Sequence, residues 1–299
     1  MRIGILSLML LAGFSAVACP TTWAGPTDDA ARSFTEGKAL LAKGDFDGAL
    51  KLYAAAAKAD PKNEEYRQQH ALLRRAIKMR QEIQDEKDAA KLESTALALR
   101  AFYYEHDLYS QALDLDKSVH VKRGTSEAAA RMAETQLQLD MNADAAALLS
   151  GLSDSQATPQ TRLLLGIALA RLGRHEDARA LARKSPKPDD LGPGLLFDLA
   201  RLHALIGDRD KATAVLIRCF ESTPPSRLET FKAYAKQCKD LGTLAASAAE
   251  FDHLMRTQSK VKESACSSGT DCGKCPSKAS CGSKDTKPAT PEGKDAPKK

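Results

Sequence analysis

The chain has 299 residues, a formal net charge of +5 and only 5% aromatic residues. Its basic excess lies at the two ends, in Arg2 and in the residues from 260 onward, which hold nine Lys against five acidic residues. Residues 25–259 therefore carry no net charge. This balance excludes the strongly basic surface that binds a phosphate backbone, so no nucleic-acid partner is expected.

Residues 1–24 have the layout of a secretory signal peptide. Arg2 precedes an uncharged, largely apolar run over residues 3–17, which is shorter than the roughly 18–20 apolar residues of a membrane-spanning helix. Small residues predict cleavage near Ala24, whereas residues 16–19 resemble a lipobox, in which Cys19 would be lipidated. Both alternatives remain open. Either one predicts an exported protein of the periplasm or cell envelope, as a secreted protein or as an outer-membrane lipoprotein.

An internal repeat of about 34 residues organises the central part of the chain. Residues 30–63 carry nearly all of its small, aromatic and proline positions: Gly37, Gly44, Phe46, Ala49, Tyr53, Ala56 and Pro61. This spacing resembles the tetratricopeptide repeat, and similar patterns start at residues 93, 127, 159 and 193. Residues 64–92 leave room for one further unit, either one long helix or a distorted hairpin. Residues 226–255 predict a closing hairpin with its turn at residues 240–242.

The resemblance implies an all-α fold over residues 25–258, a superhelix of antiparallel helical hairpins with about five to six repeats plus the closing hairpin. Small residues at repeat positions 8 and 20 would allow the two helices to cross closely. Glycine near position 15 would form the turn, and proline near position 32 would end the second helix, because proline has no N–H group. No segment alternates with period two, so no sheet is predicted.

In this family the first helix of each repeat, the A helix, lines a concave groove, so the resemblance places a partner site there. The implied residues are mostly apolar with a few cations: Phe34, Lys38, Leu41, Leu97, Tyr104, Arg131, Gln138, Leu163, Ile167, Arg171, Phe197, Arg201 and Leu205. Such a surface suits an amphipathic helix or an extended peptide, with arginine available to pair a carboxylate. The alternative is that many of the apolar residues pack against neighbouring helices. The Lys and Asn pattern with which some family members clamp a C-terminal carboxylate is absent.

Motifs of enzymes are missing from the sequence. It contains no glycine-rich phosphate loop, no Gly-x-Ser-x-Gly and no His-Glu-x-x-His, and its histidines are scattered at positions 70, 106, 120, 175, 203 and 253. Paired acidic residues lie at expected helix starts, where they complement the helix dipole. No catalytic residue and no cofactor is therefore predicted for the repeats.

Residues 259–299 form a predicted flexible tail, rich first in Cys and then in Lys and Pro. Its four cysteines are Cys266, Cys272, Cys275 and Cys281. They predict two disulfides in an oxidising compartment, a zinc or copper site of thiolates, or a redox-active pair at Cys272 and Cys275. Cys219 and Cys238, in the repeats, would form a disulfide or remain two buried free thiols.

These observations favour a protein-interaction scaffold of the cell envelope, not an enzyme, that docks a partner peptide or helix in the groove. Two alternatives remain. One is a metal-binding or thiol-redox protein that acts through the tail cysteines, and the other is a structural spacer in an envelope complex. The partner and the oligomeric state are not specified by the sequence, since one repeat architecture serves many functions.

Overall fold

The computed structural model of the chain describes residues 26–262. Within these residues it contains 14 α-helices, two short 3-10 helices and no β-strand, which confirms the predicted all-α fold. The chain forms two compact units, one ending at Ser185 and the other beginning at Pro186. The predicted signal peptide, Cys19 and the four tail cysteines lie outside the described residues. No helix between residues 26 and 262 has the length and apolar content needed to cross a bilayer.

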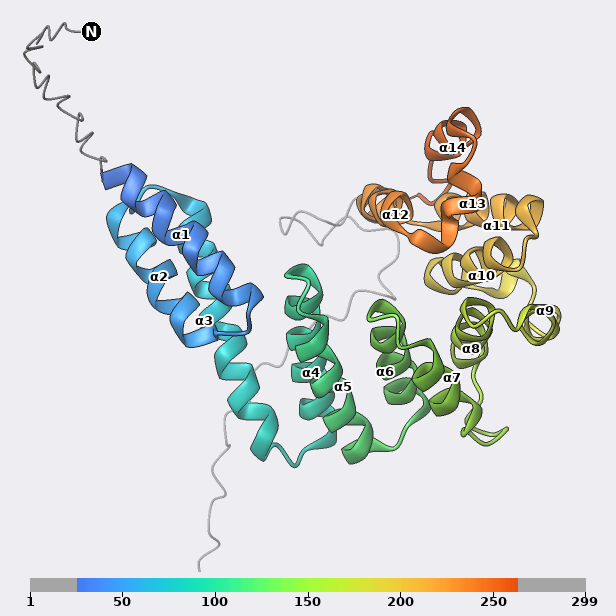
Figure 1. Ribbon diagram of the computed structural model, residues 1–299, viewed down its shortest axis with the longest axis horizontal. Coiled ribbons are helices and arrows are strands. Elements are labelled where there is room, and N and C mark those ends of the chain that lie inside the picture. The colour runs from blue at the N-terminus through green and yellow to red at the C-terminus, as the bar shows by residue number, and fades with distance from the viewer. Residues whose placement is uncertain (1–25, 263–299) are drawn as a thin grey trace, which may run out of the picture. The chain divides into compact units, whose positions relative to one another are not determined.

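Unit 1 is built from four helical hairpins and one single helix (Figure 1). Its elements are α1 (Pro26–Ala42), α2 (Phe46–Ala59), α3 (Glu64–Asp85), α4 (Ala89–Glu105), α5 (Tyr109–Arg123), α6 (Ser126–Gln138), α7 (Asn142–Ser150), α8 (Pro159–Arg171) and α9 (His175–Arg183). The pairs are α1/α2, α4/α5, α6/α7 and α8/α9. Helix α3 is thus one long helix, the first of the two alternatives that the sequence left open for residues 64–92.

Unit 2 begins with a short 3-10 helix and continues with one hairpin and a closing segment. Its elements are η1 (Pro188–Asp190), α10 (Pro193–Leu205), α11 (Arg209–Ser222), α12 (Pro225–Gln237), η2 (Lys239–Leu241), α13 (Gly242–Ala245) and α14 (Ala248–Met255). The closing segment differs from the predicted simple hairpin, because its second arm is broken into α13 and α14. Asp240 is buried and accepts a hydrogen bond from Arg201 of α10. The predicted turn therefore begins in the core instead of forming an exposed connection.

Each of the five hairpins in the described chain closes with the same three-residue turn. The middle residue adopts a left-handed conformation, and the residue after it donates its N–H to the carbonyl five positions earlier, as in Arg174 N to Leu169 O at 2.9 Å. This is the Schellman arrangement, for which glycine is the favoured residue because it has no Cβ. Gly44, Gly173 and Gly207 occupy the position in three hairpins, and Asp107 and Asp140 occupy it in the other two.

The turn at Asp140 corrects the predicted start of one repeat by one residue. Gly173 and Gly207 lie at position 15 of their repeats, and Asp140 has that position only if its repeat starts at Ser126 rather than Glu127. With this start, Ala133 and Ala145 fall at positions 8 and 20, and both are fully buried. No glycine occupies the turn of this repeat, so its start could not be aligned on one.

Close helix crossing in the first hairpin depends on Gly37 of α1. A Cβ atom at this position would lie 2.7 Å from the ring of Tyr53 in α2, which is too close for any side chain. Phe34 packs against the same ring with a centroid distance of 5.0 Å, and Tyr66 of α3 packs on Phe34 at 4.6 Å. The small residue at position 8 therefore allows a large ring at position 24 to fill the core, as the repeat pattern predicts.

Candidate functional site

In unit 1 the A helices α4 and α6 are joined by a series of polar side-chain contacts, which we call the ladder. The helical spacing of residues 93, 97, 100 and 104 places these side chains on one face of α4. The contacts that form the ladder are Glu93 with Arg131, Arg100 with Glu134, and Tyr104 with Thr135. We call the surface that carries this ladder, together with the neighbouring α8, the A-helix face of unit 1.

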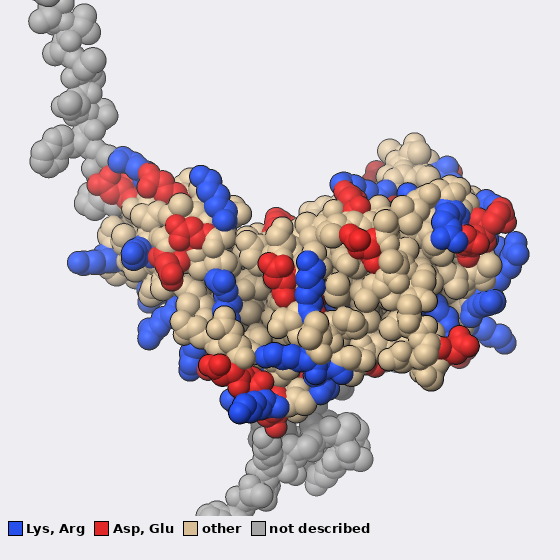
Figure 2. Space-filling view, turned by 60° about the horizontal axis from the view of Figure 1, so that its bottom comes forward, with Lys and Arg blue, Asp and Glu red and all other residues tan. Residues whose placement is uncertain are grey.

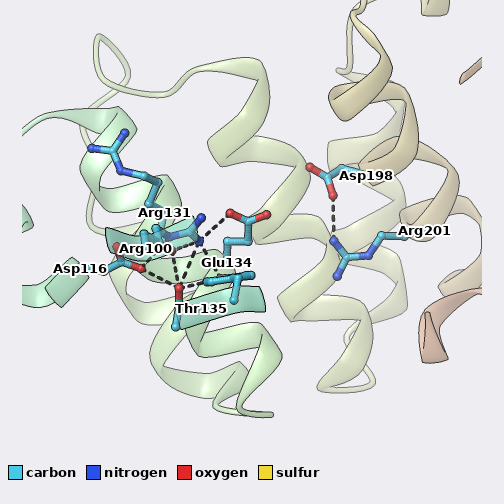
Figure 3. Close-up of polar contacts among 8 residues, drawn as sticks. Arg100, Asp116, Arg131, Glu134, Thr135, Asp198 and Arg201 are labelled. Carbon is cyan, nitrogen blue, oxygen red and sulfur yellow. Dashed lines mark hydrogen bonds and ion pairs between the residues drawn. The ribbon is translucent and has the colours of Figure 1, made fainter. Parts of the chain in front are cut away.

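Arg100 is the centre of the ladder (Figure 3). Its Nε donates to Asp116 of α5 at 3.2 Å, and its Nη2 donates to Tyr104 at 2.7 Å and to Glu134 at 2.8 Å. The Thr135 hydroxyl donates to Asp116 at 2.6 Å, which leaves the buried carboxylate well supplied with donors. Because each buried polar group has a partner, the ladder fixes the relative position of the two A helices.

The ionisation of these groups follows from their burial. Burial acts to lower the pKa of Arg100, but the carboxylates of Glu134 and Asp116 outweigh it and raise the pKa. Burial also raises the pKa of Asp116, against the opposing effects of Arg100 and the Thr135 hydroxyl. Burial, together with the nearby charge of Glu134, raises the pKa of Tyr104. Arg100 therefore stays charged and Tyr104 stays a neutral hydroxyl throughout the neutral range.

Arg100 and Asp116 occupy repeat positions 8 and 24, where Gly37 and Tyr53 lie in the first hairpin. An ion pair thus replaces the pairing of a small residue with an aromatic ring at the helix crossing. Sequence analysis did not identify Arg100, Asp116, Glu134 or Thr135. The sequence does hold a sign of this pair. Repeat positions 8 and 24, sixteen residues apart, both depart from the repeat pattern, with Arg100 in place of a small residue and Asp116 in place of an aromatic one.

Arg171, a predicted partner-binding residue at the end of α8, instead contacts the end of α6. Its Nη1 donates to the carbonyl oxygen of Leu137 at 2.6 Å and to the side chain of Asn142 at 3.4 Å. A cation at the C-terminal carbonyls of a helix is favourable because it complements the helix dipole. Arg171 therefore helps to set the position of α8 on α6. Gln138, also predicted, lies beside it at the end of α6 and is half-buried.

Most apolar residues that were predicted to line the groove are core residues. The buried ones are Phe34, Leu41, Leu163, Ile167 and Phe197, and Leu205 is half-buried. This is the alternative reading that the sequence left open. Leu97 is different, since its side chain is 45% exposed on the A-helix face. Lys38 is also exposed, but its Nζ lies 3.3 Å from Glu65 and 4.3 Å from the centre of the Phe34 ring.

In unit 2 the structure corrects the expected role of Arg201. Its Nε donates to Asp240 at 2.9 Å and its Nη1 donates to Asp198 at 2.8 Å, and the side chain is 4% exposed. These carboxylates outweigh the effect of burial and raise the pKa of Arg201, so it remains charged. A guanidinium that is buried and bonded to two carboxylates cannot pair with a carboxylate of a partner. Sequence position alone could not show this, because Asp240 is 39 residues away.

An aromatic cluster on α10 and α12 was missed by the sequence analysis. Phe197 is buried beneath Tyr234, at 5.3 Å between ring centres, and Phe231 packs edge-on at 6.3 Å. Tyr234 is 43% exposed, and the guanidinium of Arg227 lies over Phe231. The signal for this cluster was the three-residue spacing of Phe231 and Tyr234, which places both rings on one face of α12. We call Arg227, Phe231 and Tyr234 the aromatic patch of unit 2.

Cys219 and Cys238 are free thiols in the structure, so they do not form the disulfide that the sequence allowed. The Cys219 thiol donates to the carbonyl oxygen of Pro193 at 3.2 Å. Burial raises its pKa to about 12, and burial also raises the pKa of Cys238. Both thiols are therefore protonated at neutral pH and are poor nucleophiles.

Three further features bear on binding. Unit 2 has an open cavity of about 560 Å³ between α11 and the α13–α14 segment, lined by Ile217, Leu244 and Phe251 with Arg209 and Glu250 among the polar residues, and no predicted site residue lines it. On the surface in view, Lys and Arg are interspersed with Asp and Glu (Figure 2). Among the described residues, no group of three or more His, Cys, Asp or Glu side chains is arranged to hold a metal ion.

Comparison with known proteins adds a family assignment for one hairpin. The tetratricopeptide repeat family model matches residues 159–184, which contain α8 and α9. A tetratricopeptide repeat protein from Parabacteroides merdae is similar in structure, with 14% identity, a TM-score of 0.40 and coverage of 77% of this chain and 98% of that one. YrrB, described as a TPR protein with an unusual peptide-binding site, has 15% identity, a TM-score of 0.30 and coverage of 70% and 93%. No curated protein matches the sequence.

Proposed function

We propose that this chain, in which one hairpin matches the tetratricopeptide repeat family model, is an exported scaffold of the cell envelope that docks a partner peptide or helix on its A helices. It acts by binding and not by catalysis. The observation that carries the proposal is Leu97, a large apolar side chain that is 45% exposed on a face whose neighbouring side chains are held by hydrogen bonds.

Leu97 lies between Glu93 and Arg100 on one face of α4, and both of these neighbours are fixed by the ladder. A face that is already rigid loses little conformational entropy when a partner binds. Covering the exposed part of one leucine contributes on the order of 1 kcal/mol. A docked segment would therefore use Leu97 as an apolar anchor among polar residues that position it, which is the usual anatomy of a binding surface.

The aromatic patch of unit 2 supports the same function independently. Tyr234 is exposed above the buried ring of Phe197, so its orientation is determined by the core. Tyrosine and arginine are the residue types most often found at the centres of protein interfaces, because they offer a large apolar area and a polar end. Each unit thus presents one exposed anchor, Leu97 on α4 and Tyr234 on α12, the first helix of the closing segment.

Export is the part of the proposal that rests on the N-terminal sequence. The positive residue, the apolar run and the small residues before position 25 are the pattern of a secreted precursor. A protein of the envelope is in the compartment where an extracytoplasmic partner would meet these surfaces.

Site-specific photo-crosslinking in cells tests the proposal. A photoreactive residue would replace Leu97, Tyr234 or, as a control, Val121, which is 85% exposed on α5, the second helix of its hairpin. We expect a discrete crosslinked protein from positions 97 or 234 and none from position 121. Crosslinks from position 121 alone would contradict docking on the A helices and would favour a spacer that binds through its other face.

A further inference from the structure

Three charged side chains converge beside Leu97 at one end of the ladder. Glu93 of α4 accepts from Arg131 of α6 at 2.5 Å, between Oε1 and Nη2. Arg123, the last residue of α5, approaches the same carboxylate from the other side, with its Nε 3.7 Å from Oε2. Helices from two successive hairpins therefore bring two guanidinium groups to one carboxylate.

The donors at this place outnumber the acceptors. Each guanidinium has five N–H donors, whereas one carboxylate offers about four acceptor positions. A separation of 3.7 Å is too long for a hydrogen bond, and the Nε of Arg123 is buried without a hydrogen-bond partner in the described structure. The Glu93 carboxylate therefore does not satisfy both arginines, and the two guanidinium groups keep one positive charge in excess over it. Because the Arg123 Nε is itself buried, a further acceptor would have to meet the other N–H groups of the two side chains.

The neighbouring acidic residue Glu127 does not fill this role. Its pKa is lowered mainly by hydrogen bonds to its own backbone and to Thr125 and Ser126 at the start of α6, with a smaller contribution from the charge of Arg131. Its carboxylate is thus committed to the first turn of its own helix. The side chains of Arg123 and Arg131 are 31% and 16% exposed, so both are partly accessible to solvent.

We propose that Arg123 and Arg131 form a subsite for an acidic side chain of the docked segment, next to the apolar anchor Leu97. Leu97 lies one helical turn after Glu93 on the same face of α4, so an apolar and an acidic side chain about one turn apart on a partner helix match the two positions. The proposal rests on the proposed docking function and specifies the partner as an acidic amphipathic segment.

Three dye-labelled, alanine-based helical peptides test this inference when titrated into the full chain. The first is blocked at both ends and carries Leu and Glu four residues apart. The second replaces Glu by Gln, and the third combines Gln with a free C-terminal carboxylate. We expect the Glu peptide to bind about tenfold more tightly than the Gln peptide at low salt, because charge-assisted hydrogen bonds to arginine are the stronger kind. The third peptide should bind like the second.

The variant Arg123→Gln should remove most of this tenfold difference, and Arg123→Lys should retain only part of it, because lysine keeps the charge but loses the planar fork. The control Arg74→Gln, at an exposed arginine of α3 in the same unit, should leave the difference unchanged. Thermal unfolding of each variant verifies its fold.

The subsite proposal would be wrong if the affinity difference between the Glu and Gln peptides persisted in Arg123→Gln. It would also be wrong if that difference fell equally in Arg74→Gln. A gain from the C-terminal carboxylate instead of Glu would overturn its assignment to a side chain. Equal binding of the Glu and Gln peptides would overturn the subsite and leave docking on Leu97 intact, whereas no binding of any peptide at millimolar concentration would overturn both.

Discussion

Arg100 and Asp116 form an ion pair, with Nε 3.2 Å from Oδ2, at a helix crossing where the first hairpin has a glycine against an aromatic ring. The carboxylate is almost completely buried and also accepts from the Thr135 hydroxyl. A polar pair at this place gives the A-helix face its rigidity. It also makes this hairpin dependent on both partners: without Arg100 the buried Asp116 charge has no counter-ion, and without Asp116 the guanidinium keeps only the more exposed Glu134.

Replacing Asp116 should therefore destabilise unit 1 strongly. We expect Asp116→Ala to lower the free energy of unfolding by about 3 kcal/mol, because Arg100 keeps Glu134 but loses its buried partner. The matched control Asp114→Ala, two residues earlier on the exposed side of α5, should change it by less than about 0.5 kcal/mol. Urea unfolding measures both values, and equal effects would show that the pair does not hold the hairpin.

The sequence predicted the hairpins because the repeat pattern records backbone requirements. A close helix crossing is marked by Gly37, a left-handed turn by Gly173 and a helix start by Pro159. All three features were predicted correctly or to within one residue. The repeat at Ser126 was displaced by one residue because aspartate occupies its turn. Side-chain partners were harder to predict, since Arg201 and Asp240 meet through the fold and not through any regular spacing.

The difficulty of predicting side-chain contacts from the sequence also explains why several predicted groove residues are buried in the core. A position on the A helix predicts the face of a residue but not its burial, so Phe34 and Ile167 were assigned to a groove although they pack in the core. Whether the exposed members of the set contact a partner stays a prediction. The aromatic patch of unit 2 was missed because residues 226–255 were treated only as a closing hairpin.

The left-handed turn at Gly173 can be tested independently of side-chain packing. No atom lies within 4 Å of a Cβ built at this residue, so Gly173→Ala changes only the backbone preference at φ 78°. We expect a loss of stability of about 1 kcal/mol. Gly194→Ala, within α10 and equally free of nearby atoms, should not destabilise and should add up to about 1 kcal/mol. Chemical denaturation of both variants decides whether the turn conformation is required.

His203 should make unit 2 less stable in mild acid. Burial lowers its pKa, and Lys211 acts in the same direction, while Asp208 opposes them. A histidine with a lowered pKa in the folded state binds its proton more readily when unfolded. The contribution of His203 to the free energy of unfolding is therefore fully present above pH about 6.5, the pKa of histidine in the unfolded chain. It is lost as the pH falls below that value. His203→Gln should flatten the dependence of the melting temperature on pH between about 7.5 and 5.5. An unchanged slope would contradict this assignment.

The central claim is that the A-helix face of unit 1 docks a partner through Leu97, and the affinity of the crosslinked partner for two aspartate variants tests it most directly. Leu97→Asp places a charge on the apolar anchor, whereas Leu72→Asp alters a leucine of similar exposure, 39%, on α3 of the same unit. We expect a loss of about 2 kcal/mol, roughly 30-fold in the dissociation constant, for Leu97→Asp and less than about twofold for Leu72→Asp, with both variants folded. An unchanged dissociation constant for Leu97→Asp, or equal losses in both variants, would contradict docking at this face.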